Sequence, residues 1–301
     1  MPKAAIVISV YNGREHLHRC ISSVMNQTLQ DFECIIVDDG STDGSDEAAI
    51  NEITGDRRFL LYRQEHQGLS AARNAGTNLA DADVIFHLDA DDIALPEMME
   101  KATKFLLDNN LDMAFFNASV EDGGAADCHI HREEQYFQRK KDYGIGKGKD
   151  ILKEMVGNGD YVYAAFIQAT RKSRICKTFY PGLRAQDKLY TTQNLWLMNR
   201  VGHLPEILYV KKCHPKCITY SRHDAHYAWS RMKTGLELMK LAEKTPDSEL
   251  IFRMASREIS SVPRILSELK KSEMKWIASL PQPDRAWMEA FEKMSIPMRI
   301  L

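Results

Sequence analysis

The first 118 residues alternate regularly between short apolar runs and amphipathic segments, and this alternation constrains the fold more than any other feature. The apolar runs have the length of β-strands, whereas the intervening segments repeat apolar residues at helical spacing. The predicted strands are residues 4–10, 34–37, 59–62, 84–86 and 113–116, and the predicted helices lie at 17–28, from about 46, at 69–79 and at 96–107. This order predicts an α/β fold with a mostly parallel sheet covered by helices on both faces.

The rest of the chain has a different pattern. Residues 119–160 contain glycine pairs and a basic stretch, which predict irregular chain, either a functional lid or plain disorder. Beyond His223 the apolar residues recur at helical spacing. In between, strand character returns from Tyr161, and we expect a helix at 187–199 and short strands at 207–210 and 217–220. We therefore expect a donor-binding half at 1–118, an acceptor and catalytic half at 119–221, and a helical extension at 222–301.

Composition excludes several classes of protein. The net charge of -2 gives no general attraction to nucleic acid, so no nucleic-acid partner is expected. No apolar run reaches about 18 residues, and no signal peptide is recognisable, so we expect a cytoplasmic protein. Its six cysteines are then expected to be reduced. Two groups, 128–131 and 213–217, combine cysteine with histidine, but their spacing is not that of common zinc sites, so no zinc is expected.

An acidic run, Asp89-Ala90-Asp91-Asp92, directly follows the fourth predicted strand. In open α/β sheets, ligands bind beyond the carboxyl ends of the strands, where the loops converge. Mg²⁺ and Mn²⁺ prefer oxygen ligands, and one or two carboxylates can hold such an ion together with phosphate oxygens. The alternative is a solvated acidic turn before the helix that Pro96 begins. The neighbouring motifs favour the metal site.

Two of these motifs follow the second and third predicted strands. Asp38 and Asp39 precede a Gly-Ser-Thr turn, which alone would indicate no more than a strand-to-helix connection. A turn does not require two consecutive carboxylates, however, and one of them is suited to accept the N–H of a nucleobase. Arg73 lies in a stretch of small residues, where its guanidinium can bind phosphate as a fork. A solvated surface arginine is the alternative.

Together these motifs resemble those of the family 2 glycosyltransferases, which have the GT-A fold. The resemblance rests on Tyr11-Asn12, Gln27-Thr28 before Asp31-Phe32-Glu33, the turn 38–43, the stretch 67–76, and Leu88-Asp89-Ala90-Asp91-Asp92 with Pro96, in this order and spacing. It is strong over residues 1–118 and weaker over 160–221. It implies an inverting enzyme that takes a sugar from a nucleotide-sugar, usually a UDP-sugar.

The resemblance also implies roles for single residues in donor binding. Ser9 and Tyr11 would border the nucleobase and ribose, Asp39 would contact the nucleobase, and Arg73 would approach the diphosphate. Asp89 would lie near the ribose. At Ser9 the sequence departs from the family, which usually has proline there, and this puts the nucleobase contact in doubt.

For the metal, the resemblance makes Asp91 the leading ligand, with Asp89 beside it and Asp92 less clearly involved. The cofactor it implies is Mn²⁺ or Mg²⁺.

The second half must supply a catalytic base, because an acceptor hydroxyl is a poor nucleophile until a carboxylate takes its proton. Residues 179–190 resemble the family's stretch that ends in Glu-Asp, and here the pair is Gln186-Asp187. Asp187 is therefore the expected base, although an aspartate that only caps the following helix explains the pattern too. Lys212 and His214 resemble the basic strand end that closes over the donor diphosphate, and a solvated basic edge is the alternative.

Two other functions remain open from the sequence. A nucleotidyltransferase on a similar sheet would release pyrophosphate, but the segment after the first strand is a poor match to its basic glycine-rich loop. A non-catalytic subunit would keep the donor fold without the carboxylates. The expected partners are a nucleotide-sugar and a saccharide or lipid-linked acceptor, as in surface polysaccharide or glycolipid synthesis. The mixed charges of the extension favour packing or a homodimer over contact with the inner face of a membrane.

Overall fold

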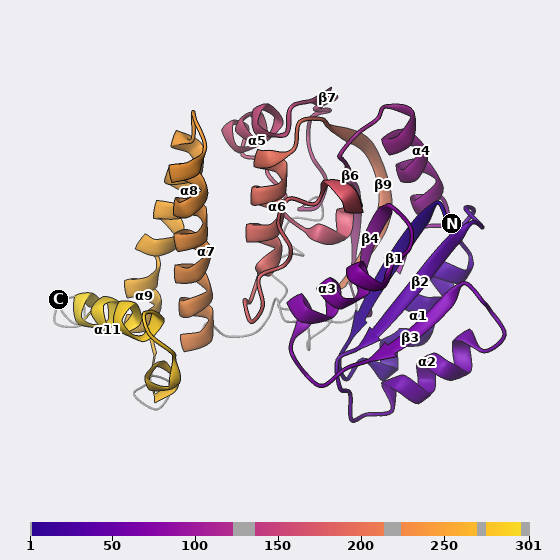
Figure 1. Cartoon of the computed structure of the whole chain (residues 1–301), viewed down its shortest axis with the longest axis horizontal. Coiled ribbons are helices and arrows are strands. Elements are labelled where there is room, and N and C mark those ends of the chain that lie inside the picture. The colour runs from indigo at the N-terminus through magenta and orange to yellow at the C-terminus, as the bar shows by residue number, and fades with distance from the viewer. Residues whose placement is uncertain (1, 123–135, 214–223, 270–274, 296–301) are drawn as a thin grey trace. The chain divides into compact units, whose positions relative to one another are not determined.

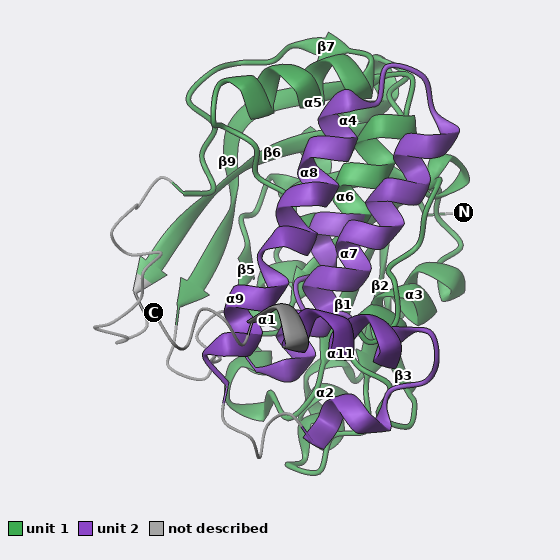
Figure 2. Cartoon of the chain, turned by 90° about the vertical axis from the view of Figure 1, so that its left-hand side faces the viewer, with its two compact units in different colours: residues 1–182, 190–217 green, residues 183–189, 218–301 purple. Residues whose placement is uncertain are grey.

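The computed structural model describes residues 2–122, 136–213, 224–269 and 275–295 (Figure 1). Three features discussed above lie outside these ranges: His214, the cysteine–histidine group at 128–131 and the strand expected at 217–220. The chain divides into two compact units, shown in Figure 2. The first contains residues 1–182 and 190–217, and the second contains residues 183–189 and 218–301.

The first unit is built on one sheet with strand order β3-β2-β1-β4-β8-β6-β9-β5, to which β7 adds by pairing with β9. The strands are β1 (Ala4–Val10), β2 (Phe32–Asp38), β3 (Phe59–Arg63), β4 (Val84–Asp89), β5 (Ile93–Ala94), β6 (Met113–Asp122), β7 (Ile145–Gly146), β8 (Gln168–Arg171) and β9 (Val201–Cys213). The pairs β3-β2, β2-β1, β1-β4 and β6-β9 are parallel, and β4-β8, β8-β6, β5-β9 and β7-β9 are antiparallel. Most of the paired residues belong to the parallel pairs, so the predicted α/β fold with a mostly parallel sheet is confirmed.

Both faces of this sheet are covered, which explains why β1 is buried at all seven positions. The helices of the unit are α1 (Arg14–Met25), α2 (Ser45–Ile53), α3 (Leu69–Leu79), α4 (Met98–Asp108), α5 (Gly148–Gly157) and α6 (Gln186–Leu197), whose first turn belongs to the second unit. Alternate residues of β1 pack with α1 and α4 on one face, and with α3 on the other. Figure 1 shows α3 and α1 on either side of the strands.

The helix α3 lies unusually close to the sheet. A Cβ atom placed on Gly76 would lie 2.3 Å from a methyl group of Val7 and 3.1 Å from one of Val37. Only glycine allows this approach, and the approach fixes how far the preceding turn of α3 reaches over β1 and β4. Arg73, one turn earlier, is thereby held against the carboxyl end of β4.

The structure corrects the expectation of irregular chain at 119–160 for part of this stretch, whereas residues 136–144 are irregular as expected. Within this stretch β6 continues to Asp122 and α5 occupies Gly148–Gly157. Gly148 allows a close contact rather than a loop, because a Cβ there would lie 1.9 Å from the carbonyl oxygen of Leu195. Arg139 is buried, and its guanidinium donates to the carbonyl oxygens of Phe116 and Val162. Gly148 and Arg139 therefore serve packing.

The second unit is helical beyond residue 224, as predicted for the described part of the extension. Its helices are α7 (Ala225–Lys244), α8 (Glu249–Ser260), α9 (Val262–Ser267), η5 (Lys275–Ser279) and α11 (Asp284–Ser295). They share an apolar core that includes Met232, Val262 and Met288. Of the helices the structure describes, none has both the length and the apolar character needed to cross a membrane.

Candidate active site

The carboxyl ends of β1, β2 and β4 lie side by side, because β1 pairs in parallel with both of the other strands. Ser9 on β1 is the register partner of Val37 on β2 and of Asp89 on β4. Register partners on parallel strands point to the same face, which here is the face covered by α3. The structure therefore brings the predicted residues Ser9 and Asp89 together.

Asp39 is buried and holds the loop that leads from β3 into α3. Its Oδ1 accepts hydrogen bonds from the side chain of Gln64 at 2.7 Å and the backbone N–H of Gln67 at 2.9 Å. Its Oδ2 accepts one from the backbone N–H of Gly68 at 2.8 Å and lies 2.9 Å from Nδ1 of His66. The carboxylate thus ties the end of β2 to the N-terminus of α3, which is a role that the sequence did not predict for it.

The side chain of Tyr11 lies just beyond β1 and stacks on His66, with ring centroids 4.0 Å apart and planes inclined by 25°. Tyr11 keeps 49% of its surface exposed. Nearby in the chain, the hydroxyl of Ser9 is buried and has no hydrogen-bond partner among the described residues. A buried hydroxyl without a partner is costly, so a polar ligand at this edge would satisfy it. These two residues offer an aromatic face and a free polar atom.

Arg73 is 2% exposed, which rules out the alternative of a solvated arginine. Its Nη2 donates to Oδ1 of Asp89 at 2.6 Å, and its guanidinium lies 5.1 Å from the ring centroid of Phe179. Burial raises the pKa of Asp89, but the positive charges of Arg73 and Lys211 outweigh this effect and hold the pKa below its usual value. Asp89 is therefore ionised at neutral pH.

The acidic run forms a cluster around one lysine. The Nζ of Lys211 lies 2.9 Å from Oδ2 of Asp92, 3.5 Å from Oδ2 of Asp89 and 3.5 Å from Oδ1 of Asp91. Burial lowers the pKa of Lys211, but the three carboxylates outweigh it and raise that pKa well above its usual value. Tyr209 also donates to Oδ2 of Asp92, at 2.6 Å. The lysine offsets the mutual repulsion of the acidic side chains.

The three carboxylates differ in what they can offer a metal ion. Asp92 is fully buried, and its oxygens already accept hydrogen bonds from Tyr209, Lys211 and the backbone N–H of Lys212. The side chains of Asp89 and Asp91 are 21% and 22% exposed. Asp91 thus keeps an exposed carboxylate although Lys211 lies 3.5 Å away. The shortest contact of Lys211 within the cluster, at 2.9 Å, is with Asp92.

The donor set fits a hard divalent cation. One oxygen from each of Asp89, Asp91 and Asp92 lies within 4.8 Å of the others. Carboxylate oxygens at a strand end are the ligands that Mg²⁺ and Mn²⁺ prefer. Because Asp92 is committed to protein donors, Asp91 and Asp89 are the better candidates to hold the ion, with further ligands coming from a bound diphosphate.

Lys212 lies at the end of β9, and its side chain is only 10% exposed and paired with Glu121 of β6. The alternative of a solvated basic edge therefore does not describe this residue. The interaction anchors the end of β9 beside β6, directly after the lysine that enters the acidic cluster. Lys211 and Tyr209 are the residues that sequence reasoning missed. Tyr209 lies in the strand expected at 207–210, and extending that strand by one residue would have placed Lys211 on the same face, which was the available signal.

Asp187 lies in the first turn of α6, within the segment Leu183–Leu189 that belongs to the second unit. On either side of this segment the chain returns to the first unit at Phe179 and Tyr190, whose rings stack with centroids 3.9 Å apart. The backbone of Phe179 is held by the side chain of Asn74 on α3, through hydrogen bonds of 2.8 and 3.0 Å. Phe179 and Tyr190, which flank this segment in the chain, are thus held close to Arg73 within the first unit.

The sequence profile of Glycosyl transferase family 2 matches residues 5–165, more than half of the chain. The chain belongs to family 2 of the glycosyltransferases. This glycosyltransferase is 26% identical over 249 residues to the glycosyltransferase YibD of Escherichia coli (strain K12), a match covering 80% of the chain and 70% of YibD. It is 29% identical over 208 residues to the poly(ribitol-phosphate) beta-N-acetylglucosaminyltransferase TarP of Staphylococcus aureus (strain N315), covering 66% of the chain and 58% of TarP.

Solved structures show the same GT-A fold at low sequence identity. S. aureus TarS 1-349 in complex with UDP is similar to this glycosyltransferase with a TM-score of 0.64 and 16% identity, covering 92% of the chain and 79% of TarS 1-349. The mannosyltransferase PcManGT of Pyrobaculum calidifontis, solved with GDP-Man and Mn²⁺, gives a TM-score of 0.57 and 14% identity, covering 99% of the chain and 87% of PcManGT. A further relative, from Haemophilus influenzae, is 42% identical over 118 residues, and the chain spans only 47% of its length.

Proposed function

We propose that this glycosyltransferase moves a sugar from a UDP-sugar to an acceptor hydroxyl with inversion at the anomeric carbon. The observation that carries the proposal is the convergence of Ser9, Arg73, Asp89 and Asp91 at one edge of the sheet. This edge combines an unpartnered hydroxyl, a buried guanidinium and a cation site. Each of these groups suits a nucleoside diphosphate, because a hydroxyl can bind its polar sugar, and a guanidinium and a divalent cation can bind its phosphates.

In the proposed complex the nucleobase packs on the exposed face of Tyr11, which His66 supports from the other side. Asp39 keeps the supporting loop in place through its four interactions with residues 64–68. Because both of its oxygens are occupied, its contribution to nucleobase recognition is to position the backbone and side chains around the nucleobase. Ser9 and Asp89 face the ribose.

Asp91 and Asp89 hold the divalent ion in this proposal, as Mg²⁺ or Mn²⁺. When bound, such an ion offsets the negative charge that develops on the departing diphosphate. Arg73 adds fixed positive charge at this edge, and Lys211 keeps the acidic cluster together before the ion binds. Lys212, whose ammonium is paired with Glu121, is proposed as a further contact of the diphosphate. PcManGT, which shares the fold, was solved with Mn²⁺ and a nucleotide-sugar.

Asp187 is the proposed catalytic base. It takes the proton of the acceptor hydroxyl as the oxygen attacks the anomeric carbon from the side opposite the nucleotide. Asp187 precedes Tyr190 by one turn of α6, and the ring of Tyr190 stacks on Phe179, which lies against Arg73. This link between the base segment and the donor-binding arginine supports the assignment.

The acceptor is proposed to be a growing surface polysaccharide or a lipid-linked saccharide. TarP, named as a poly(ribitol-phosphate) beta-N-acetylglucosaminyltransferase, and the UDP-GlcNAc complex of TarS support a UDP-N-acetylhexosamine as donor. The chain spans 58% of the length of TarP.

The decisive experiment screens UDP-sugars for thermal stabilisation of the protein with and without Mn²⁺, and then analyses the products with the best donor. Release of UDP together with a glycosylated acceptor, or with free sugar when no acceptor is present, is expected. Release of pyrophosphate from a nucleoside triphosphate would instead identify a nucleotidyltransferase. Binding of UDP-sugar with no turnover towards acceptor or water would identify a non-catalytic subunit.

A further inference from the structure

The segment Leu183–Leu189, which carries Asp187, is structurally part of the helical extension. Figure 2 shows it in the colour of the second unit, with residues 218–301, although residues 190–217 separate the two in the chain. The interactions that join them are specific. They come from two basic residues on either side of Asp187, namely Arg184 three positions before it and Lys188 directly after it.

Arg184 connects the segment to the first turns of α7. Its Nη2 lies 2.9 Å from Oδ2 of Asp224, and its backbone N–H donates to the hydroxyl of Ser230 at 3.0 Å. Asp224 also caps α7, because its Oδ1 accepts a hydrogen bond from the backbone N–H of Tyr227 at 2.8 Å. The carboxylate of Asp224 therefore fixes both the start of α7 and the side chain of Arg184.

Lys188 connects the segment to α8. Its Nζ donates to Oε1 of Glu258, and Oε2 of the same carboxylate lies 2.8 Å from Nε of Arg231 on α7. Glu258 is only 2% exposed, so it is a buried carboxylate shared by two cations. Buried ion pairs of this kind lock one geometry, because the buried carboxylate is energetically costly without its cations.

The two helices that provide these partners are themselves packed closely. A Cβ atom on Gly235 of α7 would lie 2.5 Å from Cγ1 of Ile259 and 2.9 Å from the carbonyl oxygen of Ala255 on α8. Glu258 therefore stands at a point where α7 and α8 cannot shift independently. The extension offers the segment a rigid surface rather than a flexible tail.

We propose that the helical extension positions the catalytic base, with Glu258 and Asp224 acting as positioning residues through Lys188 and Arg184. This inference rests on the proposed function, in which Asp187 is that base. A base must reach the acceptor hydroxyl within hydrogen-bond distance, and a displacement of about 1 Å can cost about 100-fold in rate. The extension thus has a defined role in turnover, separate from donor binding by the first unit.

The first test removes the tether without altering the base. Lys188→Met is expected to lower kcat by roughly 10- to 100-fold while the KM for the donor, and the stabilisation of the protein by UDP with Mn²⁺, stay unchanged. Lys188→Arg preserves the charge and is expected to restore most of kcat. Lys233→Met is the matched control, because Lys233 pairs at 3.0 Å with Asp284, which belongs to α11 in the same unit.

Amide hydrogen exchange supplies a readout that does not depend on activity. In Lys188→Met the amides of residues 183–189 are expected to exchange faster, while those of α7 keep the rates of the unaltered protein. A double-mutant cycle of Lys188→Met with Glu258→Gln is expected to be non-additive in kcat, because both changes break the same interaction. Additive losses would show that Glu258 does not act through Lys188.

Asp187→Asn, measured in parallel, distinguishes a failure of the positioning role from a failure of the assignment of Asp187 as the base. If Asp187→Asn abolishes transfer but folded Lys188→Met keeps kcat within about twofold of the unaltered protein, the positioning role is overturned and the base stands. If Asp187→Asn itself retains full kcat, the assignment of the base is wrong, and the positioning role is overturned with it.

Discussion

Arg73 on α3 and Asp89 at the end of β4 are joined by a hydrogen bond of 2.6 Å between Nη2 and Oδ1. The guanidinium is almost completely buried, whereas the carboxylate remains 21% exposed towards the edge where ligands bind in open α/β sheets. The pair therefore couples a helix on one face of the sheet to the acidic cluster at its rim. Substitutions can test each part of this arrangement separately.

Arg73→Met should weaken both stability and donor binding. The change leaves Asp89 facing only the more distant ammonium of Lys211 among the cations described here, and breaking a buried pair costs roughly 3 kcal/mol. Chemical denaturation measures the loss, and thermal shift with UDP and Mn²⁺ measures binding. Arg73→Lys keeps a charge and should recover part of the stability. Unchanged stability in Arg73→Met would show that the pair contributes nothing to the fold.

Gly76→Ala should act on the site from a distance. The added methyl group overlaps Val7, so α3 must move away from β1, and overpacking of this kind costs about 1–3 kcal/mol. Because Arg73 lies one turn earlier on α3, donor affinity should fall as well. Gly157→Ala at the end of α5 is the control, since a Cβ there meets no atom within 4 Å. Equal behaviour of the two variants in urea unfolding would contradict the close approach.

Asp91→Asn should remove the response to metal while leaving the fold intact. Losing the charge stabilisation that a divalent ion supplies amounts to several kcal/mol, so activity should fall at least about 100-fold. Without metal the variant should be about as stable as the original protein, because the charge that is lost both repels Asp89 and attracts Lys211. The measurement is the shift in thermal unfolding on adding Mn²⁺ with UDP.

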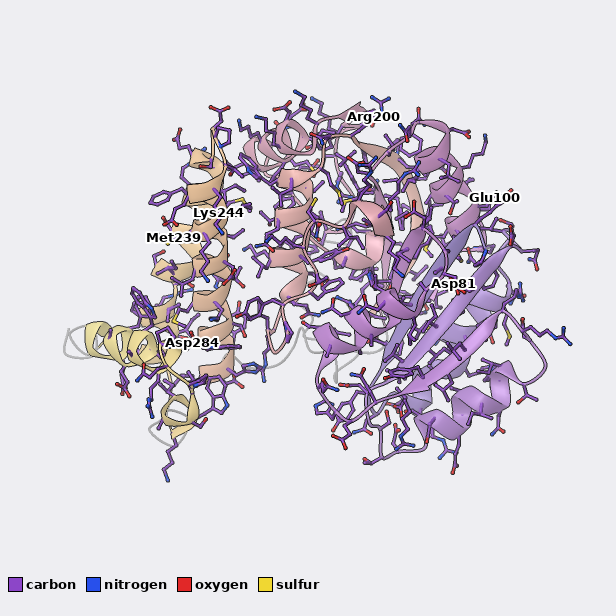
Figure 3. All side chains as sticks on the ribbon, in the orientation of Figure 1. Asp81, Glu100, Arg200, Met239, Lys244 and Asp284 are labelled. Carbon is purple, nitrogen blue, oxygen red and sulfur yellow. The ribbon has the colours of Figure 1, made fainter. Side chains whose placement is uncertain are left out.

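Asp81→Asn provides the control for this change. Asp81, labelled in Figure 3, is exposed and precedes β4, so it stands at the end of that strand opposite to Asp89. Its substitution should leave both the metal-dependent shift and the activity unaltered. If Asp91→Asn keeps a normal metal response, the ion is held elsewhere.

His87→Met should make the protein less sensitive to acid. Burial and the nearby charge of Arg73 lower the pKa of His87 from its usual 6.5 to about 3, although Asp89 opposes this. Between these values the unfolded chain binds a proton that the folded chain does not, so stability falls as pH falls, by about 1.4 kcal/mol per pH unit. From about pH 7 to about pH 5 the variant should lose about 2 kcal/mol less than the original, measured by urea unfolding. Parallel pH curves for the two proteins would refute the buried, neutral histidine.

For the donor half, the local pattern of the sequence was sufficient to predict the order of the strands and helices. Strand and helix periods, together with glycine and aspartate at strand ends, predicted the order of elements and placed Ser9, Asp39, Asp89 and Asp91 at one edge of the sheet. These predictions depend on short-range regularities, because parallel pairing of successive strands brings their carboxyl ends together whatever the details of packing. The resemblance to a known family followed from the same local motifs.

Interactions between distant parts of the chain could not be predicted in this way. Lys211 is 119 positions from Asp92, and no spacing rule connects a lysine on a late strand with an acidic turn on an early one. The same reasoning applies to Gly148, which resembled a residue of an irregular loop and instead allows a helix to touch the carbonyl of Leu195. Asp39 looked like a ligand of the nucleobase, and its carboxylate is occupied by the loop that it organises.

By itself, then, the sequence determined which elements form, in what order, and which carboxylates reach the rim of the sheet. Only the tertiary structure decided which cation stands among those carboxylates, and that the segment carrying Asp187 is held by Glu258 and Asp224 of the helical extension. The physical reason is that the apolar pattern of a segment indicates only which face of that helix or strand is buried. An ion pair between distant segments depends on where the surfaces of two such elements meet in the fold.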